Sequence, residues 1–244
     1  MIKRYLTLIM LTFCCNIVFA QHAPAWGGGA DQKDLSFGFT FSYVNNYYKI
    51  LKQPNWRSPF LDPENGNVPV TSPLNSISSA NTPGFGVGFI TRYRLTEHLE
   101  ARVTPLLIFA DRTLTYIYSD PQYNVTKSVS PTTVDFPLLL KLKSDRIQDF
   151  RAYVIGGLKY SYALGADKSD GDVALIDRNI KNINAYTSYE FGIGCDIYFE
   201  YFKLSPELKF SNSFGNVLYP ESQPYSTPIS KLSLHTVMFS LCFE

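Results

Sequence analysis

Residue types that carry catalytic or metal-binding chemistry are scarce in this chain of 244 residues. It has 3 histidines and 4 cysteines. The histidines, His22, His98 and His235, come with no recognisable serine and carboxylate arrangement of the kind that nucleophilic catalysis requires. So few ligating side chains also leave a metal site unsupported. We therefore expect no enzyme, no catalytic or cofactor-binding residues, no metal and no small-molecule substrate.

An excess of charge and a long apolar run are missing as well. The formal net charge is +1, which provides no basic surplus for binding nucleic acid. Beyond the amino terminus, no stretch approaches the roughly 20 apolar residues that a membrane-spanning helix needs. Aromatic side chains are abundant instead, at 15% of the sequence. Together with many turn-forming residues between the apolar runs, this composition favours an all-β domain.

The amino terminus has the pattern of a secretory signal peptide. Lys3 and Arg4 precede an apolar run that ends at Ala20. A charged start, an apolar centre and a small residue before the cleavage point are typical of such peptides. We predict a signal peptide over residues 1–20 and a flexible periplasmic lead-in over residues 21–34, which show no periodicity. The remaining chain of about 220 residues suits one domain.

Residues 34–43 alternate between large apolar and small polar side chains. The apolar positions are Leu35, Phe37, Phe39, Phe41 and Tyr43. A period of two predicts a β-strand with one apolar and one polar face. The same pattern recurs further along the chain. The predicted strands are 34–43 with an extension towards 47, 84–95, 99–109, 133–143, 150–162, 186–198, 202–211 and 232–244.

The connections between these strands are alternately long and short, as they are in transmembrane barrels. The first long connection, 52–83, is rich in Pro, Asn and Ser, so we expect no regular element within it. In the second, 112–131, residues 115–118 and 123–128 are expected to pair as a hairpin.

The alternation leaves two kinds of barrel open: a secreted, lipocalin-like barrel with an apolar core, and a membrane barrel whose apolar face meets lipid. The apolar face carries almost no charge for about ten residues per strand, the length that crosses a bilayer, and tyrosines gather at the strand ends. We therefore predict an eight-stranded antiparallel transmembrane β-barrel over residues 35–244, with long extracellular loops and short periplasmic turns, in the outer membrane. The lipid-facing side chains should include Phe39, Phe89, Leu140, Phe191 and Phe239.

Charged side chains fall on the opposite, inward face. They should form a lumenal cluster of Arg92, Arg94, Glu100 and Arg102. A turn centred on residue 97 places Arg94 across from Glu100, and we expect these two to form an ion pair. The same turn places Arg92 across from Arg102, and like charges directly opposite are destabilising.

The repulsion between Arg92 and Arg102 has two remedies. An acid from another strand, Asp196 or Glu207, can reach between them, or water can fill this end of the lumen. Eight strands enclose an interior barely wide enough for side chains. The inner charges should therefore plug the lumen rather than leave a pore.

Three prolines and two cysteines test the strand assignments. Pro105, Pro137 and Pro206 lie inside predicted strands although proline cannot donate to a ladder, so we expect bulges there. The alternation puts Cys195 on the apolar face and Cys242 on the polar face. We expect no disulfide between them.

Trp56 and Arg57 stand in the first long loop, on the extracellular side. Tryptophan beside arginine is typical of binding hot spots, which makes the two residues candidates for partner binding. The alternative is a lid, in which Trp56 folds back over the barrel mouth and Arg57 pairs with an acid such as Asp62.

Two parts of the chain resemble a known family. Residues 26–31 (WGGGAD), 33–39 (KDLSFGF), 48–50 (YKI) and 54–57 (PNWR) resemble the opening of the PorT/SprT proteins of the type IX secretion apparatus, and residues 201–207 (YFKLSPE) resemble their penultimate strand. The resemblance implies an outer-membrane barrel of the Bacteroidetes that is required for cargo export, and for gliding in species that glide.

Partners implied by the resemblance are outer-membrane lipid and other type IX components. Because an eight-stranded lumen is too narrow for folded cargo, such a barrel would act as an accessory or assembly factor. The alternative is a small outer-membrane channel or an OmpX-like structural barrel.

Overall fold

The computed structural model describes residues 31, 33–63, 65–129, 132–164 and 174–244. The predicted signal peptide and most of the predicted lead-in lie outside these residues. The regular elements of the described chain are β-strands, apart from one short 3-10 helix, η1 (Pro121–Tyr123). No helix in this part of the chain is long and apolar enough to cross a membrane.

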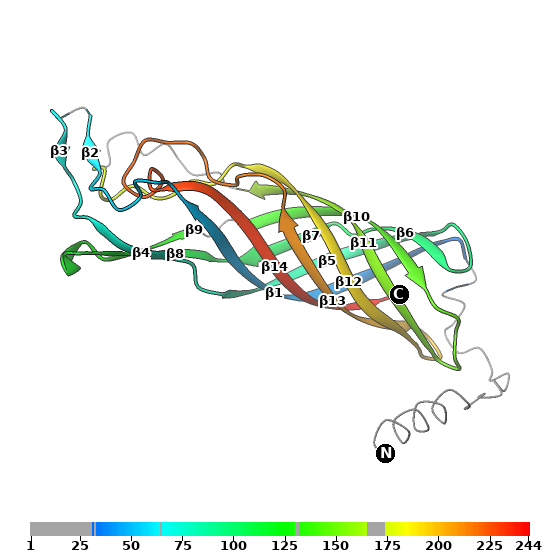
Figure 1. The fold of residues 1–244 in the computed structure, drawn as a ribbon. Coiled ribbons are helices and arrows are strands. Elements are labelled where there is room, and N and C mark those ends of the chain that lie inside the picture. Colours follow the sequence, from blue (N-terminus) through cyan, green and yellow to red (C-terminus); the bar gives the residue numbers. More distant parts are fainter. Residues whose placement is uncertain (1–30, 32, 64, 130–131, 165–173) are drawn as a thin grey trace, which may run out of the picture.

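One antiparallel sheet closes on itself to form a barrel (Figure 1). β1 pairs on one side with β14 and on the other with β5, which completes the ring. The barrel strands are β1 (Leu35–Lys52), β5 (Thr82–Arg94), β6 (Leu99–Val103), β7 (Leu106–Ala110), β10 (Thr132–Lys143), β11 (Phe150–Leu164), β12 (Ala185–Tyr198), β13 (Lys203–Ser213) and β14 (Ile229–Phe243). β6 and β7 share one position between β5 and β10, so the ring has 8 strands and the prediction is confirmed.

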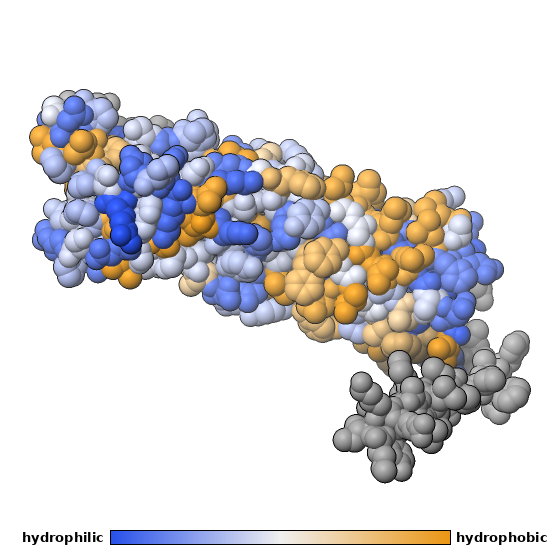
Figure 2. All heavy atoms as spheres, in the orientation of Figure 1, coloured by the Kyte–Doolittle hydropathy of each residue, from blue (hydrophilic) through white to orange (hydrophobic). Residues whose placement is uncertain are grey.

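The predicted faces of the strands are also observed. The side chains of Phe39, Phe89, Leu140, Phe191 and Phe239 are all exposed on the outer wall, and Phe89 reaches 74% exposure. Apolar side chains cover the half of the barrel nearer the described ends of the chain, and hydrophilic ones dominate the half that carries the long loops (Figure 2). The apolar half is the part that suits a bilayer.

Proline interrupts the ladders without the expected bulges. The pairing of β5 keeps one register across the break at Pro105, from Thr91 with Val103 to Gly88 with Leu106. An inserted residue would have turned every later side chain to the other face. The strands instead lose the rungs that the missing N–H groups would have formed.

The other two prolines lie at such gaps as well. Pro137 faces the same break, because its carbonyl accepts from the amide of Thr104 at 3.4 Å. At Pro206 the β12–β13 ladder lacks the rungs between Gly194 with Glu207 and Ile197 with Leu204, again without a shift of register.

The expectation of a structureless first loop was wrong. It contains the hairpin of β2 (Leu61–Asp62) and β3 (Val68–Pro69), followed by β4 (Leu74–Ser78). β4 pairs with β8 (Arg112–Tyr118) of the second loop, which pairs in turn with β9 (Val125–Val129). The β8–β9 hairpin confirms the one predicted there. Leu74 and Ile77 of β4 are buried, so a distant partner strand and an apolar core outweigh the local proline content.

Candidate functional site

The middle of the lumen is filled by ion pairs. Arg102 lies 2.6 Å from the Glu207 carboxylate, and the Tyr153 hydroxyl donates to the same carboxylate at 2.8 Å. Lys209 lies 3.1 Å from Glu190 and 3.5 Å from Glu207. All five side chains are buried. Charges this far from water need an opposite charge in contact, and each of these has one.

Further pairs lie above and below this layer. Lys159 contacts Asp135 at 3.0 Å. Lys141 contacts Asp196 at 2.7 Å, and Ser205 donates its hydroxyl to the same carboxylate at 2.6 Å. Lys159 also lies 3.6 Å from Glu190, which links its pair to the central layer. Inward positions of several strands therefore supply the ion pairs that occupy the lumen.

The predicted hairpin register is confirmed, but the ion pair predicted from it, Arg94 with Glu100, is wrong. Arg94 does lie across from Glu100, and Arg92 lies across from Arg102. Arg94 binds Asp34 instead, at 2.8 Å, because it ends β5 at the barrel rim beside the start of β1. Glu100 contacts Arg92 at 2.6 Å. Strand twist brings this diagonal pair together in preference to the direct one.

The two opposed arginines are neutralised separately. Of the two acids expected between them, Glu207 binds Arg102 and Asp196 binds Lys141. Arg92 is held by Glu100 and by Glu244, the latter at 2.8 Å. Among the carboxylates of the described residues, none contacts both arginines.

Residues outside the predicted cluster complete it at the periplasmic mouth. Lys143 pairs with Glu100, and Lys203 contacts Glu244 at 2.7 Å. The alternation already placed Lys143 and Lys203 inward, so considering every strand would have found them. The alternation could not have identified Asp31, because Asp31 precedes the first strand.

Asp31 ties the segment before β1 to the barrel mouth. Its carboxylate lies 3.2 Å from Arg92, 3.5 Å from Lys203 and 3.7 Å from Arg151, and it accepts from the Tyr198 hydroxyl. Burial raises the pKa of Asp31, but attraction to Lys203 and the hydrogen bond from Tyr198 outweigh it and hold this pKa well below its usual range. At least this residue of the predicted flexible lead-in is anchored.

The seam between β1 and β14 is sealed on both faces. Outside, Phe243 stacks on Phe39 with ring centroids 5.0 Å apart. Inside, Cys242 donates to the Thr40 hydroxyl at 3.5 Å. Cys195 lies on the outer wall and Cys242 in the lumen, as the alternation predicted, and both are free thiols.

The extracellular end of the lumen is closed mainly by apolar packing, around the buried side chains of Arg112 and Lys127. One cluster of buried side chains joins the barrel to the sheet of β4, β8 and β9. It includes Tyr116 of β8, Leu232 of β14 and Ile180. The Tyr116 hydroxyl donates to the carbonyl of Tyr225 at 2.8 Å. Ion pairs therefore fill the lumen from its middle to its periplasmic end. The apolar cluster closes the extracellular end, and we call it the cap.

Trp56 belongs to this cap, whereas Arg57 does not. Trp56 is half-buried against the apolar cluster, with Lys52 4.0 Å and Arg57 5.0 Å from its ring centroid. Arg57 itself is exposed. This geometry suits the lid interpretation for Trp56 and leaves Arg57 accessible to a partner.

A family relationship agrees with this closed barrel. The family described as outer membrane protein beta-barrel domain matches residues 19–219. The chain belongs to this family. Its barrel therefore resides in the outer membrane, with lipid around the apolar half.

Solved structures with a similar fold include two outer-membrane proteins. The crystal structure of OprG from Pseudomonas aeruginosa is 10% identical, with a TM-score of 0.48, over 89% of this chain and 95% of that one. The solid-state NMR structure of AlkL in DMPC bilayers is 12% identical, with a TM-score of 0.36, over 94% of each chain. A comparison with curated proteins found no match.

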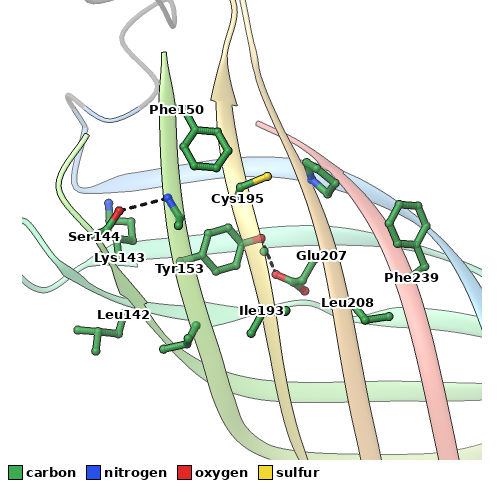
Figure 3. Close-up of a pocket in the computed structure, with 14 residues that line it drawn as sticks. Leu142, Lys143, Ser144, Phe150, Tyr153, Ile193, Cys195, Glu207, Leu208 and Phe239 are labelled. Atoms are coloured by element: carbon green, nitrogen blue, oxygen red, sulfur yellow. Dashed lines mark hydrogen bonds between the residues drawn. The ribbon is translucent and has the colours of Figure 1, made fainter. Parts of the chain in front are cut away.

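The outer-membrane barrel has a groove of about 740 Å³ in its wall (Figure 3). Outward-facing apolar side chains line it, among them Leu142, Phe150, Val154, Ile193, Leu208 and Phe239. The groove lies beside the ladder gap at Pro206. Behind it the Tyr153 ring packs over Gly194, where an added Cβ would stand 2.5 Å from the ring. Tyr153 and Glu207 remain buried, so the groove is a lipid-facing hollow with a closed floor.

No group of His, Cys, Asp or Glu side chains in the described chain could hold a metal ion.

Proposed function

We propose that this barrel is an accessory or assembly component of type IX protein secretion, required for cargo export and for gliding where that occurs. The observation that carries the proposal is the filled lumen: Arg102, Glu207 and their neighbours occupy its centre without exposure to solvent. A barrel closed in this way works through its loops, its mouth and its outer wall. The likeness of residues 26–57 and 201–207 to the PorT/SprT proteins supplies the choice of secretion system.

Deletion of the gene tests this proposal. Cargo should accumulate in the periplasm while permeability to small solutes hardly changes. Co-purification of the tagged protein from native membranes would identify the secretion component that it contacts. Normal export in the deletion strain would refute the secretion role.

The rival channel function predicts a different result. The purified barrel in planar bilayers should show no large and stable single-channel steps if it is an accessory component. Such steps, together with normal export, would favour a small channel. Normal export without any such steps would favour an OmpX-like structural barrel.

Trp56 and Arg57 provide the sharper test of docking. We expect Arg57→Ala to impair export with normal barrel assembly, because Arg57 is exposed. Trp56→Ala should instead loosen the cap, because Trp56 packs on the apolar cluster. Export and the heat-dependent gel shift of the barrel separate the two effects. Normal export in the Trp56→Ala/Arg57→Ala double variant would remove the docking hypothesis.

A further inference from the structure

The outer ends of β1 and β14 carry two lysines on the lipid-facing side of the wall. Lys49 is paired with Ser233, and Lys231 is paired with Leu51. Both lie in the same outward alternation as Tyr43. They are diagonal neighbours on adjacent strands, about 7–8 Å apart at the backbone, so their long side chains can converge on one anion.

Two more basic side chains follow where the chain leaves the barrel. Lys52 and Arg57 lie 4.0 and 5.0 Å from the Trp56 ring centroid. We call Lys49, Lys52, Arg57 and Lys231 the outer cationic patch. Hydrophilic side chains gather over these strand ends, beyond the apolar band (Figure 2).

The outer cationic patch is uncompensated. Within the described residues, none of its four members lies within ion-pair distance of a carboxylate, whereas lumenal Arg102, Lys141, Lys159 and Lys209 each do. Lys49 and Lys231 are like charges on neighbouring strands, so they repel one another. An external anion would remove this repulsion.

The height of the patch on the wall identifies the kind of anion. Strands tilted by about 40° rise about 2.5 Å per residue along the membrane normal. An apolar band about 25 Å tall that begins at Leu35 therefore ends between Tyr43 and Tyr47. At this edge Tyr47 stacks on His235, with ring centroids 5.2 Å apart, as interfacial aromatic residues do. Lys49 and Lys231 stand just above, at the level of the outer-leaflet headgroups.

We propose that the outer cationic patch binds the phosphate groups of an outer-leaflet glycolipid of the lipid A type. Lys49 and Lys231 contact the phosphate, Lys52 and Arg57 add charge from the loop, and the wall below receives the acyl chains. The site is continuous with the lipid-facing surface, which favours a membrane lipid over a soluble anion. Charge-assisted hydrogen bonds from lysine and arginine to phosphate are among the stronger polar contacts.

The test uses the purified full-length barrel in detergent and native mass spectrometry with diphosphorylated lipid A. Lys49→Gln/Lys231→Gln should bind it about tenfold more weakly, since two charge-assisted contacts are lost. Lys33→Gln/Arg146→Gln removes the same charge at the periplasmic end and should bind as the wild type does. Lys49→Arg/Lys231→Arg should retain binding. The heat-dependent gel shift confirms that each variant is folded.

Two further arms use the wild-type barrel alone. Dephosphorylated lipid A should bind about tenfold more weakly than the phosphorylated form, and millimolar inorganic phosphate should not displace the lipid. Equal binding of both lipids, displacement by inorganic phosphate, or an equal loss in the periplasmic control would overturn the proposal.

Discussion

Arg102 and Glu207 illustrate what a buried ion pair requires of its partners. Glu207→Leu leaves Arg102 buried beside Lys209 without its closest carboxylate, and we expect a loss of about 3–5 kcal/mol of unfolding free energy. Arg102→Met should be similarly harmful. The double variant Arg102→Met/Glu207→Leu should recover most of the loss, because no uncompensated charge remains. Urea unfolding in lipid vesicles, followed by the gel shift, measures the three values, and a double variant as unstable as the sum of the singles would contradict this.

On the outer wall, adding a charge rather than removing one should destabilise the barrel. Leu140 is exposed towards lipid at 54%, and Leu140→Arg should lower the unfolding free energy by about 2–4 kcal/mol. Thr104→Ser, on the inner face, keeps its hydroxyl and should change it little. The same urea titration compares them. A harmless Leu140→Arg would mean that this part of the wall does not face lipid.

At the scale of whole elements, Asp31 fastens the segment before β1 to the barrel. A carboxyl whose pKa is lower in the folded state adds stability above its ordinary value, near 4, and loses it only as the pH falls through the lowered value. Hydrogen exchange of residues 33–36, corrected for intrinsic rate, should therefore show equal protection at pH 7.5 and pH 5. Asp31→Asn should reduce protection at both pH values.

The matched control for this experiment is Asp145→Asn. Asp145 is exposed and pairs with His98 in a periplasmic turn, so its loss should leave residues 33–36 unchanged. A fall in wild-type protection between pH 7.5 and pH 5 would argue against the ionised anchor.

The elements themselves differ in how far the sequence could predict them. Barrel strands such as β12 alternate over their whole length, so the pattern assigned both the strand and its inner face. β4 is short and is stabilised by β8, which lies far along the chain, and no local pattern reports such a partner. Within the site, the register of β5 and β6 followed from the turn. The Arg92–Glu100 contact depended on strand twist, and Asp31 on a segment without periodicity.

For the molecule as a whole, two closures stand in series, an ionic lumen and an apolar cap. Tyr116→Ala should weaken the cap, since Tyr116 is fully buried and bonded to Tyr225. It should not create a conductance, because the Arg102 and Lys141 layers still fill the lumen. Planar-bilayer recordings of this variant should show no large and stable steps. Their appearance would mean that the ionic layers do not block the path.

A disulfide across the seam between the first and last strands would report when the barrel closes in the living cell. Thr40 and Cys242 are paired residues whose side-chain oxygen and sulfur are already in contact, while Cys195, the other cysteine of the described residues, points out of the barrel. In Thr40→Cys two thiols would meet across the seam, within the range of a disulfide, only after the two ends of the chain have found each other. The oxidised fraction at successive times after synthesis would then record when each new molecule becomes a ring, and a mutant or a missing assembly partner that delays this step would be visible as a late cross-link.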